Sequence, residues 1–251
     1  GREVAEINFD VSTPDGTAYS AAARVGNATL DAGRNVTVSA HNSTDALSEA
    51  AGVAGGLVGA GAGVSVINVG DHSLAELGGT LRAGGNVRIS AEDGQDGTTQ
   101  ALAQAGGGGL VGLGAAVAVS EKSSQTTARI LDGANITAGG ALSVDADLDH
   151  ALKAQTVGVS AGGVAVGASI ATSSSTGQAQ ALVGKNVQVS AGSLAVDASA
   201  RSSNNVDAVG VSGGIVAGNA VVATASDHTS ARAWVDDGSR VTTQGAIGIR
   251  A

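Results

Sequence analysis

The chain has 251 residues, with no cysteine, no methionine, and one residue each of proline, tryptophan, tyrosine and phenylalanine. The lack of cysteine excludes a disulfide framework and thiol chemistry, and it is compatible with an exported protein. The near absence of proline suits long sheets, where proline would delete a hydrogen bond of the ladder. A globular core normally uses aromatic side chains, leucine and methionine. Alanine, valine and 40 glycines must fill the interior here, which favours thin and regular layers.

Positive charge is also scarce, because 22 acidic residues face 13 basic ones and the formal net charge is −9. No cluster of lysine and arginine is present, and few aromatic side chains could stack on bases. This composition argues against nucleic acid and against docking on anionic lipid. No stretch reaches the roughly 18 uninterrupted apolar residues of a membrane-spanning helix, so we predict no membrane insertion.

What is present is a repeat, in which a glycine-containing corner precedes apolar residues at every second position. This two-residue alternation is typical of a half-buried strand. The motif occurs at 32–40, 83–91, 138–146, 191–198 and 244–251. Its first apolar residues are Val36, Val87, Leu142, Leu194 and Ile247, which are 51, 55, 52 and 53 residues apart. A fixed period of this size predicts an all-β fold, a parallel β-helix (β-solenoid) of about five repeats of about 52 residues.

A second motif has the same period and consists of glycine, alanine and valine. It occupies 55–66, 108–119, 162–172 and 213–224, and its first glycines are 53, 54 and 51 residues apart. Both strand faces are apolar, so we expect these segments to be buried on both sides or to form the closest contact between sheets. Gly112, Gly114 and Ala116 should lie at such a contact. We expect the polar stretches that follow each segment to be solvated strand faces.

The number of coils in each repeat follows from where turns can form. Two ordinary coils of about 26 residues are one alternative, because glycine pairs occur twice in each repeat. However, residues 115–131 contain no Gly, Pro, Asn or Asp, and residues 141–157 contain no Gly or Pro. We therefore favour one flattened coil per repeat, with two long strands and one short strand. This arrangement predicts that Val87 and Leu142 are direct neighbours.

The repeats divide the chain into two parts. Residues 1–21, which include the turn signal Pro14-Asp15-Gly16, are interpreted as the tail of a preceding repeat. Residues 22–251 are interpreted as a β-solenoid array cut from a longer chain. Such a fragment has unpaired strand edges, so we expect end-to-end self-association in addition to contacts with neighbouring repeats.

Candidate catalytic residues are few. Asp71-His72 and Asp227-His228 are 156 residues apart, three periods, which predicts one shared column with about 14 Å between the pairs. Neighbours on a strand also point to opposite faces, so neither aspartate can orient its own histidine. We expect these pairs, together with Asp149-His150 and the lone His41, to be surface polar residues.

Other candidate sites are equally weak. Asp145, Asp147 and Asp149 alternate onto one strand face, and Asp197 repeats Asp145 one period later. Oxygen ligands of this kind suit a cation, but the calcium-binding GGxGxD pattern and the EF-hand loop are missing. The glycine-rich runs lack the Lys-Ser/Thr of a phosphate loop. Trp234 is interpreted as a packing variant of a small aliphatic position. We therefore predict no catalytic, cofactor-binding or metal-binding residue and no enzyme activity.

Three stretches carry a resemblance to a known family: DGANITAGGALSVDA at 132–146, GGVAVGASIAT at 162–172, and ARILDG at 128–133. They resemble the repeat regions of very large bacterial surface exoproteins, the filamentous-haemagglutinin-like and leukotoxin-like filamentous adhesins. The resemblance implies a parallel β-solenoid stalk that is exported across the outer membrane and displayed at the cell surface or released. It implies no catalytic residues.

Two function classes follow. The first is a structural or adhesive stalk segment of an extracellular or surface-displayed filamentous adhesin, which contacts a host or neighbouring-cell surface or a matrix polysaccharide. The alternative is a polysaccharide-binding or polysaccharide-processing β-helix, which would need a cleft with carboxylates and aromatic side chains. An ice-binding variant would need regular threonine ladders, and Thr172 above Thr224 is the only such hint.

Overall fold

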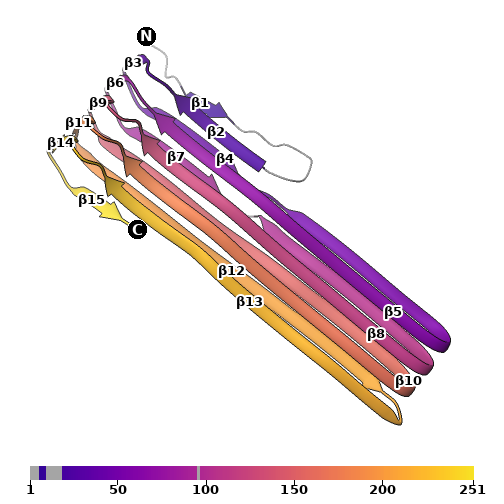
Figure 1. Ribbon diagram of the computed structural model, residues 1–251. Helices are drawn as coiled ribbons and strands as arrows, with labels where there is room; N and C mark the ends of the chain where they lie inside the picture. Colours follow the sequence, from indigo (N-terminus) through magenta and orange to yellow (C-terminus); the bar gives the residue numbers. More distant parts are fainter. Residues whose placement is uncertain (1–5, 10–18, 95–96) are drawn as a thin grey trace.

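The computed structural model describes residues 6–9, 19–94 and 97–251, so the turn predicted at Pro14-Asp15-Gly16 lies outside the described residues. These residues form strands and no helix, and the strands build long parallel sheets, an arrangement compatible with a β-solenoid (Figure 1). In chain order the strands are β1 (Glu6–Phe9), β2 (Tyr19–Val25), β3 (Thr29–Ala32), β4 (Val36–Asn42), β5 (Ala46–Leu77), β6 (Thr80–Ala83), β7 (Val87–Asp93), β8 (Thr98–Ile130), β9 (Asn135–Ala138), β10 (Ala141–Val183), β11 (Gln188–Ala191), β12 (Ser193–Gly213), β13 (Val216–Val235), β14 (Arg240–Thr243) and β15 (Ile247–Arg250).

Each repeat contributes one short strand and two long stretches of strand, here called legs, which a bend joins. The short strands β3, β6, β9, β11 and β14 form a separate parallel sheet at one end of the molecule (Figure 1). From this end the chain runs out along one leg, bends, and returns along the other. The bends fall at the glycine pairs of the second motif, and these pairs are in register: Gly55 with Gly108, and Gly56 with Gly109.

The register between repeats confirms that each repeat adds one layer to the stack. Val36 pairs with Val87, Val87 with Leu142, Leu142 with Leu194, and Leu194 with Ile247. The predicted neighbours Val87 and Leu142 are thus direct partners, so the alternative of two coils per repeat is wrong. The long strands β8 and β10 also run without interruption through the regions in which no turn was predicted.

The interior at the short-strand end, here called the base, is made of large aliphatic side chains. They come from three rows of strands: the ends of the return legs, the short strands, and the starts of the outgoing legs. The fully buried members with the largest side chains include Leu77, Leu81, Ile89, Ile130, Ile136 and Leu142. Burying one such side chain stabilises the fold by about 1.5–3 kcal/mol, so the base holds most of the hydrophobic driving force.

The far half, here called the blade, consists of the segments 46–66, 99–119, 152–172 and 204–224, which pair in register. Its interior contains alanine, and glycines let the two layers touch. A Cβ atom added at Gly112 would lie 2.3 Å from the carbonyl oxygen of Ala161, closer than real Cβ atoms come. The predicted close sheet contact is therefore confirmed. The other alternative, burial on both sides, is wrong, because outward side chains such as Val64 are 60% exposed.

The polar stretches after the blade were predicted to be solvated, and this is only half correct. Between residues 121 and 126, Lys122, Ser124 and Thr126 are buried, whereas the odd-numbered residues are exposed. Strand alternation forces this outcome, since Ala116 and Ala118 already point inward and every second residue must follow them.

The close packing of the blade makes a testable prediction about glycine. Gly112→Ala should lower the free energy of unfolding by about 1–3 kcal/mol, because the added methyl group meets backbone that can move only with its layer. Gly108→Ala is the matched control, since a Cβ there has nothing within 4 Å. Its free energy of unfolding should change by less than about 0.5 kcal/mol. Denaturant unfolding of both variants measures the difference, and equal values would contradict the close contact.

Candidate functional site

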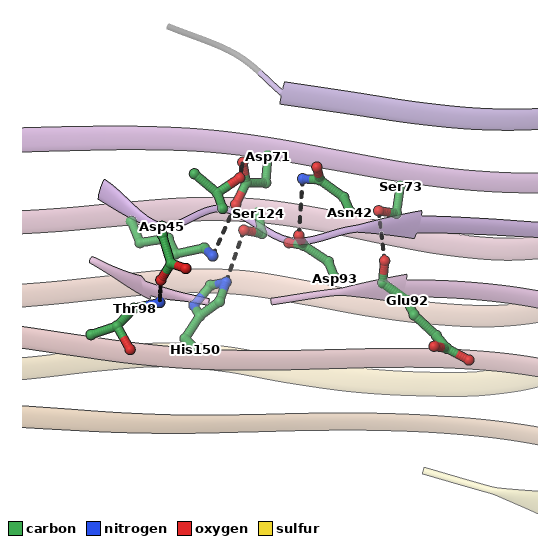
Figure 2. A network of polar contacts seen from close by, with 11 residues as sticks. Asn42, Asp45, Asp71, Ser73, Glu92, Asp93, Thr98, Ser124 and His150 are labelled. Carbon is green, nitrogen blue, oxygen red and sulfur yellow. Dashed lines mark hydrogen bonds and ion pairs between the residues drawn. The ribbon is translucent and has the colours of Figure 1, made fainter. Parts of the chain in front are cut away.

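A buried polar cluster, here called the junction network, lies along the legs between the base and the blade, and Figure 2 shows its side chains from close by. Its side chains come from strands of three consecutive repeats and from the link between β4 and β5. All of them are buried: Asn42, Thr44, Asp71, Asp93, Lys122, Ser124 and His150. Strand alternation points these residues inward just as it points leucine and valine inward in the base. The interior therefore changes from aliphatic to polar to alanine-rich along each leg.

An ion pair lies at the centre of the junction network. Lys122 Nζ is 2.9 Å from Asp71 Oδ2, and the two side chains are 1% and 0% exposed. The hydroxyl of Thr44 donates a hydrogen bond to Asp71 Oδ1 at 3.1 Å. Apart from the ion pair, neither Lys122 Nζ nor Asp71 Oδ2 has a hydrogen-bond partner among the described residues. Two charges with so few partners are costly to bury, because their desolvation is only partly repaid.

The two residues belong to neighbouring repeats and sit diagonally across the ladder. Lys122 pairs in register with Val69, and Asp71 pairs with Ser124. A side chain as long as lysine can span this diagonal. The ion pair therefore joins one repeat to the next at a point where no water reaches it.

Asp93 is a second carboxyl group in the network and is fully buried. It accepts a hydrogen bond from Asn42 Nδ2 at 3.1 Å. Burial, reinforced by the charge of Asp71, raises the pKa of Asp93 to about 6, while the charge of Lys122 and hydrogen bonds from Ser124 and Asn42 act in the opposite direction. This carboxyl group can thus hold or release a proton near neutral pH.

His150 closes the network from the third repeat. Its Nε2 lies 2.8 Å from the Ser124 hydroxyl, and its Nδ1 has no hydrogen-bond partner among the described residues. Burial, together with the charge of Lys122, lowers the pKa of His150 to about 4, against the opposing charges of Asp71 and Asp227. The imidazole is therefore neutral at physiological pH.

The predicted column shared by Asp71 and Asp227 is wrong. Asp71 aligns successively with Ser124, Gly177 and Thr229, so Asp227 is displaced by two positions. The error arises because three repeats span 158 residues along this column and not 156. Asp227 instead pairs with Ser175, whose hydroxyl donates a hydrogen bond to Asp227 Oδ1 at 3.0 Å.

The prediction of surface exposure is also wrong for two of these residues. Asp71 and His150 are buried, whereas His41, Asp227 and His228 are exposed as expected. Surface exposure was the simplest interpretation of polar residues in polar stretches. This interpretation fails where the inward-pointing positions of a strand fall within a polar stretch.

The acidic row lies on the outside of β10, as the alternation predicted. Asp145, Asp147 and Asp149 are half-buried, and Asp197 is the register partner of Asp145. Arg88 Nε lies 3.4 Å from Asp145 Oδ2. Burial raises the pKa of Asp145, and the charge of Arg88 opposes this shift. Among the described residues, no group of three or more His, Cys, Asp or Glu side chains could hold a metal ion.

The predicted role of Trp234 needs correction. It pairs with Leu182, but the next residues in this column are Arg129, Glu76 and Arg24, not small aliphatic ones. Both arginines form ion pairs with Glu76. This column of register partners points outward. It consists of three charged residues followed by an apolar pair, Leu182 and Trp234.

Sequence analysis missed Lys122, Asp93 and Ser124 as members of a site. A signal for Lys122 and Ser124 was available, because they continue the inward series that Ala116 and Ala118 begin. No comparable signal marked Asp93, which meets them only through the stacking of two repeats.

The outer surface of the blade is a second unusual feature. Apolar side chains from successive repeats form rows, of which one comprises Val64, Val117, Ile170 and Val222. Beside it, alanine and glycine leave a shallow trough over Ala60–Ala62, Leu113–Ala115 and Val166–Ala168. Contiguous exposed apolar surface of this extent is typical of regions that contact other molecules.

Comparison with known proteins gives no family. No family model, curated protein or solved structure matches the chain. In the described part of the chain, no helix is long and apolar enough to cross a membrane.

The buried histidine makes a prediction about pH. The pKa of His150 is about 4 in the folded chain and 6.5 in the unfolded chain, so the unfolded chain takes up the proton first as the pH falls. The stability that depends on neutral His150 is complete above pH 6.5 and is lost towards pH 4, by about 3 kcal/mol. His150→Gln should therefore lose less stability over this range than the unaltered chain.

Denaturant unfolding at several pH values measures this difference. His228→Gln is the control, because His228 is exposed and the variant keeps His150. The raised pKa of Asp93 acts with the opposite sign, since that stability is lost as the pH rises, but Asp93 is present in all three proteins. Equal acid sensitivity of the two variants would contradict a buried neutral histidine.

Proposed function

We propose that the chain is a non-catalytic structural and adhesive segment of a secreted or surface-displayed bacterial filamentous adhesin, in which the repeats stack as a β-solenoid stalk. The observation that carries this proposal is the parallel pairing of each described repeat with the next. Each repeat makes its ladder contacts with its sequence neighbours, so the fold can be lengthened one repeat at a time.

The distribution of chemical groups supports a structural role. The carboxyl groups with the most unusual surroundings, Asp71 and Asp93, are buried and cannot touch a polymer at the surface. The trough over the blade and the hollow beside Trp234 are lined by no Asp or Glu side chain, which disfavours the alternative of polysaccharide processing. The apolar rows of the blade instead offer a broad surface for adhesion to another cell surface or to a matrix polysaccharide.

In-register insertion tests the stalk. Residues 84–138 form one complete repeat, because Gly139 N donates a hydrogen bond to the carbonyl oxygen of Ala83. Three extra copies are placed after Ala138, each with Lys122→Ser and Asp93→Asn, the residue types of the register partners Ser175 and Asn42, so that no buried charges stack on one another. They should continue the stack and lengthen the particle by about 14 Å, since each layer adds about 4.8 Å. Electron microscopy or small-angle scattering measures the length.

The matched control carries three inserts of the same composition in scrambled order, which should neither stack nor lengthen the particle in a regular way. A polysaccharide panel incubated with the unaltered chain tests the non-catalytic part of the proposal, and no new reducing ends are expected. Failure of the ordered inserts to lengthen the particle, or release of sugar, would contradict the proposal.

A further inference from the structure

The junction network contains the components of a self-catalysed covalent bond. An amine and a carboxyl group lie 2.9 Å apart, from Nζ of Lys122 to Oδ2 of Asp71, and both are shielded from solvent. Cγ of Asp71, the atom that the amine would attack, is bonded to Oδ2 and so lies within about one bond length of this contact, and such proximity can replace a large part of the activation barrier. A third group, Asp93, is close enough to interact electrostatically with both.

We propose that Lys122 and Asp71 condense to an intramolecular amide that joins two neighbouring repeats, with Asp93 carrying the proton. The ammonium group first gives a proton to the Asp71 carboxylate, which leaves a neutral amine and a neutral acid. The Nζ lone pair attacks Cγ of Asp71, the Cγ–OH bond breaks, and one water leaves. One positive and one negative charge become one neutral amide, so atoms and charge balance without any oxidant or co-reactant.

The surroundings favour this reaction over a permanent ion pair. A buried ammonium group offers three donors, yet Lys122 Nζ has no hydrogen-bond partner among the described residues besides its contact with Asp71. Condensation removes both buried charges and their desolvation cost. A neutral acid and a neutral amine are also the forms that burial prefers, and they are the forms that react.

Asp93 fits the role of proton carrier by position and by protonation. It is fully buried, and Gly94, the residue that follows it, would place an added Cβ atom 3.5 Å from Lys122 Nζ. Asn42 Nδ2 holds its carboxyl group by a hydrogen bond to Oδ1. With a pKa raised to about 6, it can donate a proton to the departing oxygen and accept one from the attacking nitrogen.

The pair of a buried lysine and a buried aspartate occurs once among the described repeats. The register partners of Lys122 in neighbouring repeats are Val69 and Ser175, so no like charge stacks above or below the lysine. A ladder of buried lysines would repel itself, whereas a single lysine between an aliphatic residue and a serine has only Asp71 to satisfy it. The bond therefore joins the first repeat to the second at one defined point.

The mass of the intact, unfolded chain decides the proposal. The purified protein should be lighter than its sequence by one water, and digestion with trypsin should yield segment 35–82 joined to segment 89–129, because the acylated Lys122 is not cleaved. A folded protein with the full sequence mass would overturn the proposal. So would a loss of water that fragmentation places at an Asp-Gly step instead of at Lys122.

Variants identify the two partners. Lys122→Arg and Asp71→Ala should each show the full mass of their own sequence, whereas the control Lys153→Arg should still lack one water. Asp71→Asn provides a second measurement with little change in shape, since condensation would then release ammonia in place of water. Loss of water that persists in Lys122→Arg would overturn the assignment even if another variant fails to fold.

The part played by Asp93 is tested separately. In Asp93→Asn, the folded chain should form the bond at least about 100-fold more slowly, which is the usual contribution of a positioned acid or base. Asp93→Glu should restore part of the rate and a dependence of the rate on pH. Bond formation at the original rate in folded Asp93→Asn would overturn the role of Asp93.

Discussion

The parallel backbone ladder between repeats is the constraint on which the rest of the structure depends. Once Val36, Val87, Leu142, Leu194 and Ile247 are partners, the residues of the strands that begin with them have their layer and their inward or outward direction fixed. Strand pairing continues on both sides of the places where repeats differ in length. The partner of Leu142 lies 55 residues before it, yet the partner of Ala151 lies only 53 residues before it, so the extra residues are taken up between two paired stretches.

The same alternation produces three different interiors, and the distance between the two layers decides which residues fit. In the base a third row of strands holds the layers apart, and leucine, isoleucine and valine fill the space. In the blade only two layers remain, and they approach until glycine and alanine are the side chains that fit. The junction network lies between these two regions, and there polar side chains such as Lys122 and Ser124 share their columns with the smaller Ser175 and Gly177 of the next repeat.

The fold was largely predictable because its information is local and repeated. The alternating valines and leucines predicted the strands, and the lack of turn residues predicted that the strands are long. The repeat period predicted which strands pair. The candidate site was not predictable to the same degree. Asp71 and His150 were expected at the surface because they stand in polar stretches, and a constant period misplaced Asp227 by two positions. Asp93 and Lys122 meet only after the repeats stack, which no spacing within one repeat reveals.

The buried charges also bear on how the register is selected. In the blade, a slip of two residues between repeats would keep every alanine and glycine inward, so packing there discriminates weakly between registers. A slip that moved Lys122 towards Ile67 would bury an ammonium group and the Asp71 carboxylate without partners. Breaking a buried pair in this way costs about 3–5 kcal/mol. A slip in either direction would also separate Gly56 from Gly109 at the bend. The buried polar residues and the glycine bends thus select one register, which the packing of the low-complexity blade segments does not select by itself.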